Sequence, residues 1–267
     1  MHRLSRAWLP TVFHCLAALS CFCLPALARS SDAEPAVRAG YIEFPPYSYT
    51  DQQGQAAGDM IDLVRLLAER AGYRVEFIYN PSFRLFRSLE SGQIELWATV
   101  VNHPILSPHV LQSRYRLTRL KLNLYYLGAT EPQLPQALRG SRLLLMQGFV
   151  YPNSPLTPII EDPSYNIIKV QAPTHNAAVQ MLQLQRADYL LNYQPPMEQA
   201  MLETGLPTPA HVTILAQDFT LAVSKRSTRA ARLRDDFDRA LEQLITAGQL
   251  PERFKEVARH DPSVPSD

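Results

Sequence analysis

Aromatic side chains on a stiff loop, rather than acid–base pairs, are the first groups here whose spacing suits a binding site. Phe44-Pro45-Pro46-Tyr47 directly follows an apolar run at residues 37–42. Adjacent prolines cannot donate to a strand ladder, so the motif predicts the end of a strand and a rigid loop. Ligands of open sheets bind beyond the carboxyl ends of parallel strands. A rigid loop at that position can present Phe44 and Tyr47 to a ligand with little loss of conformational entropy on binding. The alternative is that both rings seal a core.

A second group of candidate side chains lies on the apolar run at residues 94–101 and just beyond it. Trp97 and Thr99 share one face if this run is a strand, because side chains alternate along a strand. Asn102 follows at the strand end and adds an amide. Trp97 suits the wall of a binding site and a core equally well.

Side chains typical of catalysis or metal binding do not form a convincing pattern. His103 and His109 lie six residues apart around prolines, without the spacing of a metal site. Asp235 and Asp238 share a face of an expected helix with arginines nearby, which is typical of a solvated surface. The sequence has no nucleophile elbow, phosphate loop or dinucleotide glycine motif. We therefore expect no catalytic residue, no metal and no cofactor.

The elements that would position these groups alternate between strand and helix. Strands are expected at residues 37–42, 74–79 and 94–101, because these runs are apolar or alternate. A helix at residues 60–71, capped by Asp59, and a second helix, capped by Ser82, fall between them. This order predicts parallel strands with right-handed crossovers.

A second cycle follows and predicts a second lobe. Its strands are expected at 142–147, 167–170 and 189–193; its helices begin after Thr174, which caps a helix through residue 186, and at Pro195-Pro196. Apolar runs at 120–128 and 219–224 flank this unit and are expected to connect the lobes, and a helix at 229–247 returns to the first one. The fold class is α/β, with two lobes of mixed, mostly parallel sheets joined by two hinge strands.

Four short motifs resemble those of the bacterial family 3 extracytoplasmic solute-binding proteins, which have the type 2 periplasmic binding fold. They are the aromatic-proline loop, Gly-Asp-Met-Ile-Asp-Leu at 58–63, Ser-Gly-Gln-Ile-Glu-Leu at 91–96 and Val-Ser-Lys-Arg-Ser at 223–227. The resemblance covers nearly all of residues 36–257. It implies two lobes, which we place at residues 36–122 and 220–258 for lobe 1 and at 129–215 for lobe 2. As the end of the chain, residues 259–267 are expected to form a flexible tail. The lobes would close on a ligand like a hinged trap.

The resemblance also implies which residues hold the ligand. Tyr47 would stack on it, joined by Phe44, while Thr99 and Asn102 would bind its head group. The loop of lobe 2 that starts with Gln147 and Gly148 would approach the ligand closely, although Gly148 suits an ordinary tight turn as well. The remaining members of this cleft are aromatic and amide residues, namely Phe149, Tyr151, Asn192 and Tyr193. Such a lining suits a neutral or weakly polar ligand.

This chain departs from the family pattern at both charged anchors. Amino-acid-binding members place an arginine shortly after the strand that holds Thr99, where it grips a carboxylate through two hydrogen bonds. Residues 102–109 contain no arginine, and Arg84, Arg87 or Arg114 would have to replace it. The aspartate that usually holds the ammonium group is absent from residues 192–194. An ordinary zwitterionic amino acid is therefore a poor candidate ligand.

The first 28 residues are typical of a secretory signal peptide. Arg3 and Arg6 precede a mostly apolar segment at residues 8–24, and small residues end the signal at Ala28. Pro10 and His14 interrupt the apolar segment, which argues against a membrane anchor. All three cysteines lie within these residues, so cleavage after Ala28 leaves none; lipidation is the alternative. We expect a periplasmic protein.

Composition limits the possible partners. Without the signal the chain has 239 residues and a formal net charge of −1, since two of its 26 basic residues are lost and all 25 acidic ones remain. No basic stripe suggests nucleic acid. The sequence favours a monomer that binds a small molecule and delivers it to an ABC permease. The alternatives are a sensory protein that signals to a membrane partner, and a dehydratase-like enzyme on the same fold.

Overall fold

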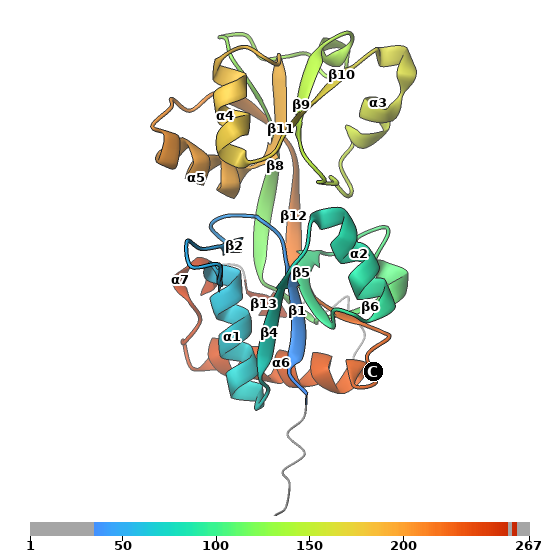
Figure 1. Cartoon of the computed structure of the whole chain (residues 1–267), viewed down its shortest axis with the longest axis vertical. Helices are drawn as coiled ribbons and strands as arrows, with labels where there is room; N and C mark the ends of the chain where they lie inside the picture. Colours follow the sequence, from blue (N-terminus) through green and yellow to red (C-terminus); the bar gives the residue numbers. More distant parts are fainter. Residues whose placement is uncertain (1–34, 256–257, 261–267) are drawn as a thin grey trace, which may run out of the picture. The chain divides into compact units, whose positions relative to one another are not determined.

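The structure, a computed structural model, describes residues 35–255 and 258–260. The expected signal peptide at residues 1–28 and most of the expected tail lie outside these ranges. Within them, one sheet runs in the order β10-β9-β11-β8-β12-β5-β1-β4 and extends through two α/β lobes (Figure 1). None of the helices in the described ranges is long and apolar enough to span a bilayer.

Lobe 1 contains the parallel strands that the sequence predicts. Its elements are β1 (Val37–Tyr41), β2 (Tyr49–Thr50), β3 (Ala56–Ala57), α1 (Asp59–Ala71), β4 (Val75–Tyr79), α2 (Ser82–Ser91) and β5 (Leu96–Val100). Strand β1 pairs in parallel with both β4 and β5. The apolar stripe of α1 faces the core through buried residues including Leu63 and Leu67, as the helical period predicts.

The starts of both lobe 1 helices differ from the expected caps. The N-cap of α1 is Gly58, at φ 116°, and Asp59 is the first helical residue. The first N–H groups of α1 bond the carbonyls of Pro46 and Tyr47 at 3.0 and 2.8 Å, so they need no side-chain cap. A Cβ on Gly58 would lie 2.6 Å from both carbonyl oxygens. This close approach fixes the aromatic-proline loop on α1.

The second helix shows the same shift by one residue. Pro81 is the N-cap of α2, and Ser82, expected as the cap, is its first residue. Proline before the helix holds an extended conformation that leads the chain into the first turn. The Ser82 hydroxyl is therefore free of the capping role.

Lobe 2 repeats the pattern of parallel strands and covering helices. Its elements are β9 (Arg142–Met146), α3 (Thr157–Glu161), β10 (Ile168–Ala172), α4 (His175–Gln183), β11 (Tyr189–Tyr193) and α5 (Gln194–Thr204). Strand β9 pairs in parallel with β10 and β11. Helix α4 ends three residues before the expected end, and Gln185 there takes a left-handed conformation (φ 54°).

Thr174 caps α4 as the sequence predicts, with its hydroxyl oxygen accepting the Ala177 N–H at 3.1 Å. Thr174→Ala should lower the free energy of unfolding by about 1 kcal/mol, because one backbone donor of the first turn loses its acceptor. Urea unfolding measures this change. Thr204→Ala is the control, since the Thr204 hydroxyl bonds only a helical carbonyl at Ala200. Equal losses in the two variants would contradict the capping role.

Two long strands run between the lobes, as expected. They are β8 (Thr118–Tyr126) and β12 (Ala210–Ser224), paired antiparallel along most of their length with an irregularity between Thr213 and Leu215. Strand β8 also pairs with β11 of lobe 2, and β12 pairs with β5 of lobe 1. Strand β12 begins nine residues before the expected run at 219–224, because pairing with β8 extends it over residues 210–218.

The end of the chain packs back on lobe 1. Helix α6 (Ala230–Thr246) lies beside α1, and α7 (Glu252–Lys255) follows it. Short strands β6 (Val110–Gln112) and β7 (Tyr115–Arg116) complete the lobe. Strand β13 (Arg259–His260) pairs with β7, so the first two residues of the expected flexible tail are in a sheet.

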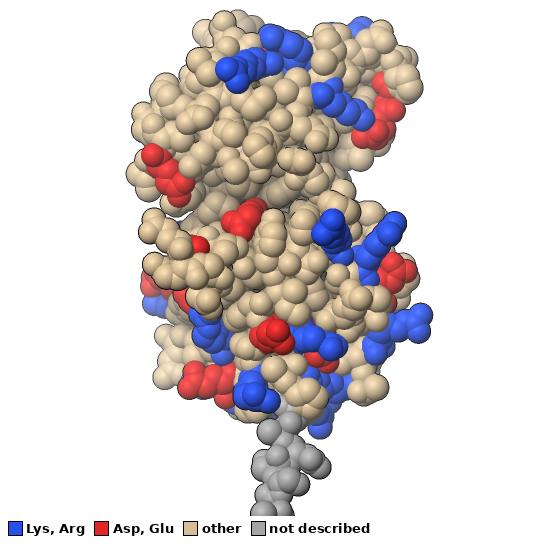
Figure 2. All heavy atoms as spheres, viewed as in Figure 1, with Lys and Arg blue, Asp and Glu red and all other residues tan. Residues whose placement is uncertain are grey.

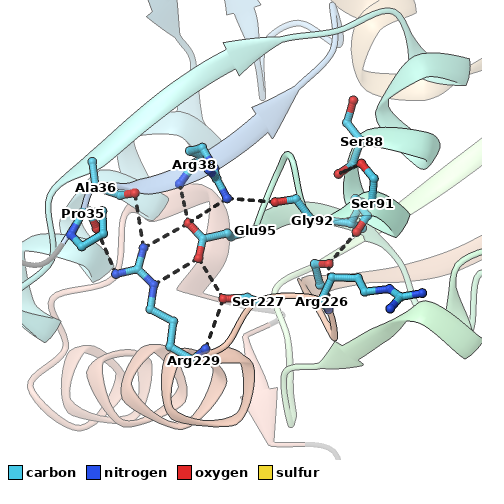
Figure 3. A network of polar contacts seen from close by, with 12 residues as sticks. Pro35, Ala36, Arg38, Ser88, Ser91, Gly92, Glu95, Arg226, Ser227 and Arg229 are labelled. Atoms are coloured by element: carbon cyan, nitrogen blue, oxygen red, sulfur yellow. Dashed lines mark hydrogen bonds and ion pairs between the residues drawn. The ribbon is translucent and has the colours of Figure 1, made fainter.

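A buried ion pair joins the start of β5 to the start of α6 (Figure 3). Arg229 donates to Glu95 from Nε at 3.1 Å and from Nη2 at 3.0 Å, and both side chains are nine-tenths or more buried. Ser227 and the Arg38 amide also donate to this carboxylate. Burial favours a raised pKa for Glu95, but the hydrogen bonds from Arg229 and Ser227 lower the pKa overall. Arg229 also bonds the carbonyls at residues 35 and 36.

Candidate functional site

A pocket of about 860 Å³, counted out to its open mouth, lies where the carboxyl end of the lobe 1 strands meets lobe 2. Its walls come from β1, β5, α1 and α2, from the loop after β9 and from β8 and β12. Figure 2 shows a hollow between the lobes with mainly uncharged atoms on its visible walls and charged groups at its rim. No Asp, Glu, Lys or Arg of the described residues lines the pocket.

Six of the ten residues expected in the site line this pocket, and four do not. Those that line it are Phe44, Tyr47, Trp97, Thr99, Phe149 and Tyr193. The others lie behind it or outside it: Asn102, Gln147, Tyr151 and Asn192.

Phe44 is the centre of an aromatic cluster that includes both lobes. Its ring centroid lies 5.3 Å from that of Tyr193, 6.2 Å from Phe219 and 6.4 Å from Phe149. Phe44 comes from the lobe 1 loop, while Phe149 follows β9 and Tyr193 ends β11 in lobe 2. Phe44 is only 6% exposed, so the cluster is both a pocket wall and a packed contact between the lobes.

Tyr47 lines the pocket but is held firmly by its neighbours. Its hydroxyl lies 3.1 Å from the Thr118 hydroxyl at the start of β8, and its ring packs 6.2 Å from the Phe254 ring. The Arg253 guanidinium lies over the same ring at 5.4 Å. Because the chain around Tyr47 also caps α1, this residue joins the loop to the rest of lobe 1.

Trp97 and Thr99 point to the same face of β5, as alternation predicts. Trp97 packs 5.6 Å from Phe86 of α2 in a buried cluster and also lines the pocket, so both interpretations of this residue hold. Thr99 is 2% exposed and lines the pocket beyond Trp97.

The four remaining residues have other contacts. Asn102 is exposed with φ 52°, and Gln147 is exposed after β9. Tyr151 is buried, and its hydroxyl accepts the Met146 N–H and donates to the Leu191 carbonyl, both at 3.0 Å. It therefore anchors the loop after β9. Asn192 is fully buried behind Tyr193.

Asn192 belongs to a hydrogen-bond chain that joins the lobes through a histidine. Its Oδ1 accepts the Tyr193 N–H at 2.9 Å, which turns its Nδ2 toward His175 Nδ1 at 3.0 Å. His175 must then accept at Nδ1 and carry its proton on Nε2, which lies 3.4 Å from the Glu43 carbonyl of lobe 1. Burial lowers the pKa of His175 to about 4.

Sequence reasoning missed several polar pocket residues. Ser82, His103 and Thr118 line the pocket, and Phe219 adds an aromatic wall. His103 is 1% exposed, and burial lowers its pKa to about 4. The sequence offered His103 only as a metal ligand, and no group of His, Cys, Asp and Glu in the described ranges is arranged to hold a metal.

The arginines considered as carboxylate anchors are placed elsewhere. Arg114 is paired with Asp235 at 2.6 Å and with Asp238 at 3.5 Å. Arg84 and Arg87 are exposed on α2, and the Arg84 guanidinium lies 5.7 Å from the Phe83 ring. None of these three arginines lines the pocket.

Comparison with known proteins agrees with this geometry. The family model of bacterial extracellular solute-binding proteins, family 3, matches residues 37–257. A solved histidine kinase sensor domain with similarity to periplasmic binding proteins is 24% identical, with a TM-score of 0.67 over 81% of this chain and 92% of its own. No curated protein matches the chain.

Two further solved structures have the same fold at lower identity. An ancestral arginine-binding protein bound to arginine is 18% identical, with a TM-score of 0.68 over 84% of this chain and 99% of its own. A putative L-cystine ABC transporter from Listeria monocytogenes is 19% identical, with a TM-score of 0.68 over 84% and 98%. At these identities the likeness establishes the fold.

Proposed function

Because this chain belongs to the bacterial extracellular solute-binding proteins, family 3, we propose that it captures a small polar or aromatic solute between its two lobes in the periplasm. The observation that carries the proposal is the pocket itself, whose walls come from both lobes and are rich in aromatic rings. A ligand that touches both lobes binds their closed arrangement better and so favours it. The expected signal peptide supports the location.

The solute is proposed to pass to an ABC importer, with this chain acting as a monomer and catalysing no reaction. The putative cystine ABC transporter among the similar structures supports this role. The sensor domain among them supports a second candidate, in which ligand binding is signalled to a separate membrane partner. Neighbouring genes for a permease and an ATPase would favour import, and their absence would favour sensing.

A thermal-shift screen tests the binding proposal. The panel holds amino acids, polyamines, opines, aromatic acids, sugars and short peptides. A solute that binds only the folded chain raises Tm, since a hundredfold excess over Kd stabilises by about 2.7 kcal/mol. We expect at least one such solute, and a panel without any would contradict the proposal.

The Phe44→Leu variant tests whether a solute found in the screen binds in this pocket. Leucine keeps most of the buried volume but loses the ring, so we expect the Kd to rise about tenfold, with a smaller effect on folding. Isothermal titration measures the Kd. Tyr79→Leu is the matched control, because Tyr79 is half-exposed at the end of β4 and does not line the pocket. Equal affinity in Phe44→Leu and the parent would place the solute elsewhere.

A further inference from the structure

Three of the polar side chains that line the pocket are Ser82, Thr99 and His103. The Ser82 and Thr99 hydroxyls and the Nε2 of His103 make no hydrogen bond to another described residue, while His103 Nδ1 has a partner. The three residues are 6%, 2% and 1% exposed, so little of each side chain faces solvent. A polar group that lines a pocket and has no protein partner is available to hydrogen-bond a bound solute. All three come from lobe 1, at the start of α2, near the end of β5 and in the loop after β5.

His103 has a defined hydrogen-bonding role. Its Nδ1 lies 3.2 Å from the Ile105 backbone nitrogen and accepts that N–H. The neutral ring therefore carries its proton on Nε2, which becomes a donor toward the pocket. The ring packs 4.9 Å from the Phe86 ring, which fixes its plane. Burial keeps His103 neutral near pH 7, since its pKa is lowered to about 4.

The polar groups are surrounded by aromatic rings. Phe86 packs against both His103 and Trp97, and Trp97 lies on the same face of β5 as Thr99. The Ser82 and Thr99 hydroxyls can each donate or accept, while His103 can only donate here. These groups suit an aromatic solute with a hydrogen-bond acceptor, which His103 would bind, and a neighbouring donor, which a hydroxyl would bind.

Charge narrows the class of solute further. The described residues that line the pocket are all uncharged, and Arg114 is engaged with Asp235 and Asp238. A carboxylate or ammonium group would be buried here without a counter-charge, which strongly disfavours its binding. A neutral amide or carbonyl would gain hydrogen bonds without that penalty.

We propose that Ser82, Thr99 and His103 form a subsite for the carbonyl or amide end of an uncharged aromatic solute, whose ring packs against Trp97. This inference rests on the proposed function, because it assigns the chemical class of the solute bound in the same pocket. In this subsite, neutral hydrogen-bonding side chains rather than charged residues select the solute.

Three probes with one ring and different charge test the class: benzamide, benzoate and benzylamine, the last a cation near neutral pH. Trp97 reports binding by its fluorescence, because it is the single tryptophan of residues 29–267; the other, Trp8, lies within the expected signal peptide. We expect saturable quenching by benzamide, with benzoate and benzylamine at least about tenfold weaker. Tighter binding of either charged probe would overturn the neutral subsite and leave solute capture intact.

Two substitutions test the residues. His103→Asn keeps an acceptor for the Ile105 N–H and removes the Nε2 donor, while Thr99→Val removes a hydroxyl at constant shape. Each should weaken benzamide binding about tenfold. His109→Asn is the matched control, because His109 is partly exposed beside Glu90 and does not line the pocket. Unchanged benzamide affinity in both variants would overturn the assignment of these residues.

The experiment separates failure of this inference from failure of the proposed function. If benzamide does not bind but another solute of the thermal-shift panel does, the subsite class is wrong and solute capture stands. If neither benzamide nor any panel solute binds, both fall. Circular dichroism of each variant verifies that lost binding does not reflect unfolding.

Discussion

Glu95→Ala should lower the free energy of unfolding by about 3 to 5 kcal/mol, because it leaves the buried Arg229 guanidinium without its carboxylate. The same change removes the acceptor for Ser227 and for the Arg38 amide. Figure 3 shows that these donors come from β1 and from the segment that leads into α6, so the loss affects both sides of lobe 1. Urea unfolding with a two-state fit measures the change.

Arg38→Ala is the matched control for this ion pair. The Arg38 side chain is nearly half exposed and lies 3.8 Å from the same carboxylate, so its removal should change stability by less than about 1 kcal/mol. A double-mutant cycle of Glu95→Ala with Arg229→Ala should show strong coupling. If Glu95→Ala and Arg38→Ala lower the free energy of unfolding equally, the buried Glu95–Arg229 pair does not stabilise the fold more than the exposed Arg38 contact does.

The pH dependence of this network has a defined sign. The pKa of Glu95 is lower in the folded chain than its ordinary value, so the unfolded chain binds a proton more readily. The stability contributed by Glu95 is therefore present above its ordinary pKa and is lost as the pH falls below it. Glu95→Gln should flatten this part of the acid unfolding curve.

Much of the fold follows from local patterns. The apolar and alternating runs predict β1, β4, β5, β8, β9, β10 and β11 within a few residues, and the family resemblance and fold class are confirmed. The helix starts were wrong where distant carbonyls act as caps. Asp59 is not a cap because Pro46 and Tyr47, folded onto α1, already accept its first N–H groups. No local pattern encodes this contact.

The site was predicted less completely, for the same physical reason. A stiff loop beyond a strand indicates that aromatic rings face the cleft. It does not indicate which ring contacts the other lobe and which is held by its own lobe. Phe44 joins the cluster between the lobes, whereas the Tyr47 hydroxyl is taken by Thr118. The direction of Asn192 depends on a backbone donor at Tyr193, and that of His103 on one at Ile105. Such orientations arise from tertiary packing and leave no mark in residue spacing.

The buried histidine between the lobes should make the folded chain sensitive to mild acid. Protonation would place an N–H on His175 Nδ1 against the Asn192 amide donor. Asn192 cannot turn its oxygen there without losing the Tyr193 N–H. Glu203, the acidic group that acts on this ring, offsets burial only in part. The imidazole therefore stays neutral in the folded chain until the pH approaches its lowered pKa of about 4.

The sign and size of the effect follow from linkage. Unfolded histidine binds a proton near pH 6.5, so between about pH 6.5 and pH 4 the unfolded state holds more protons and stability falls with pH. His175 should contribute a loss of about 3 kcal/mol over this range, since one pKa unit is worth about 1.4 kcal/mol. His103, with its similarly lowered pKa, adds a second loss in the same direction.

His175→Gln should remove one of these two losses, because glutamine stays neutral and its Nε2 can still donate toward the Glu43 carbonyl. Urea unfolding at intervals between about pH 7 and pH 4 measures the slope. His211→Gln is the control, since it removes an exposed histidine outside the contact between the lobes. If the unfolding free energy of His175→Gln changes with pH as steeply as that of the parent chain, the acid sensitivity arises from groups other than His175.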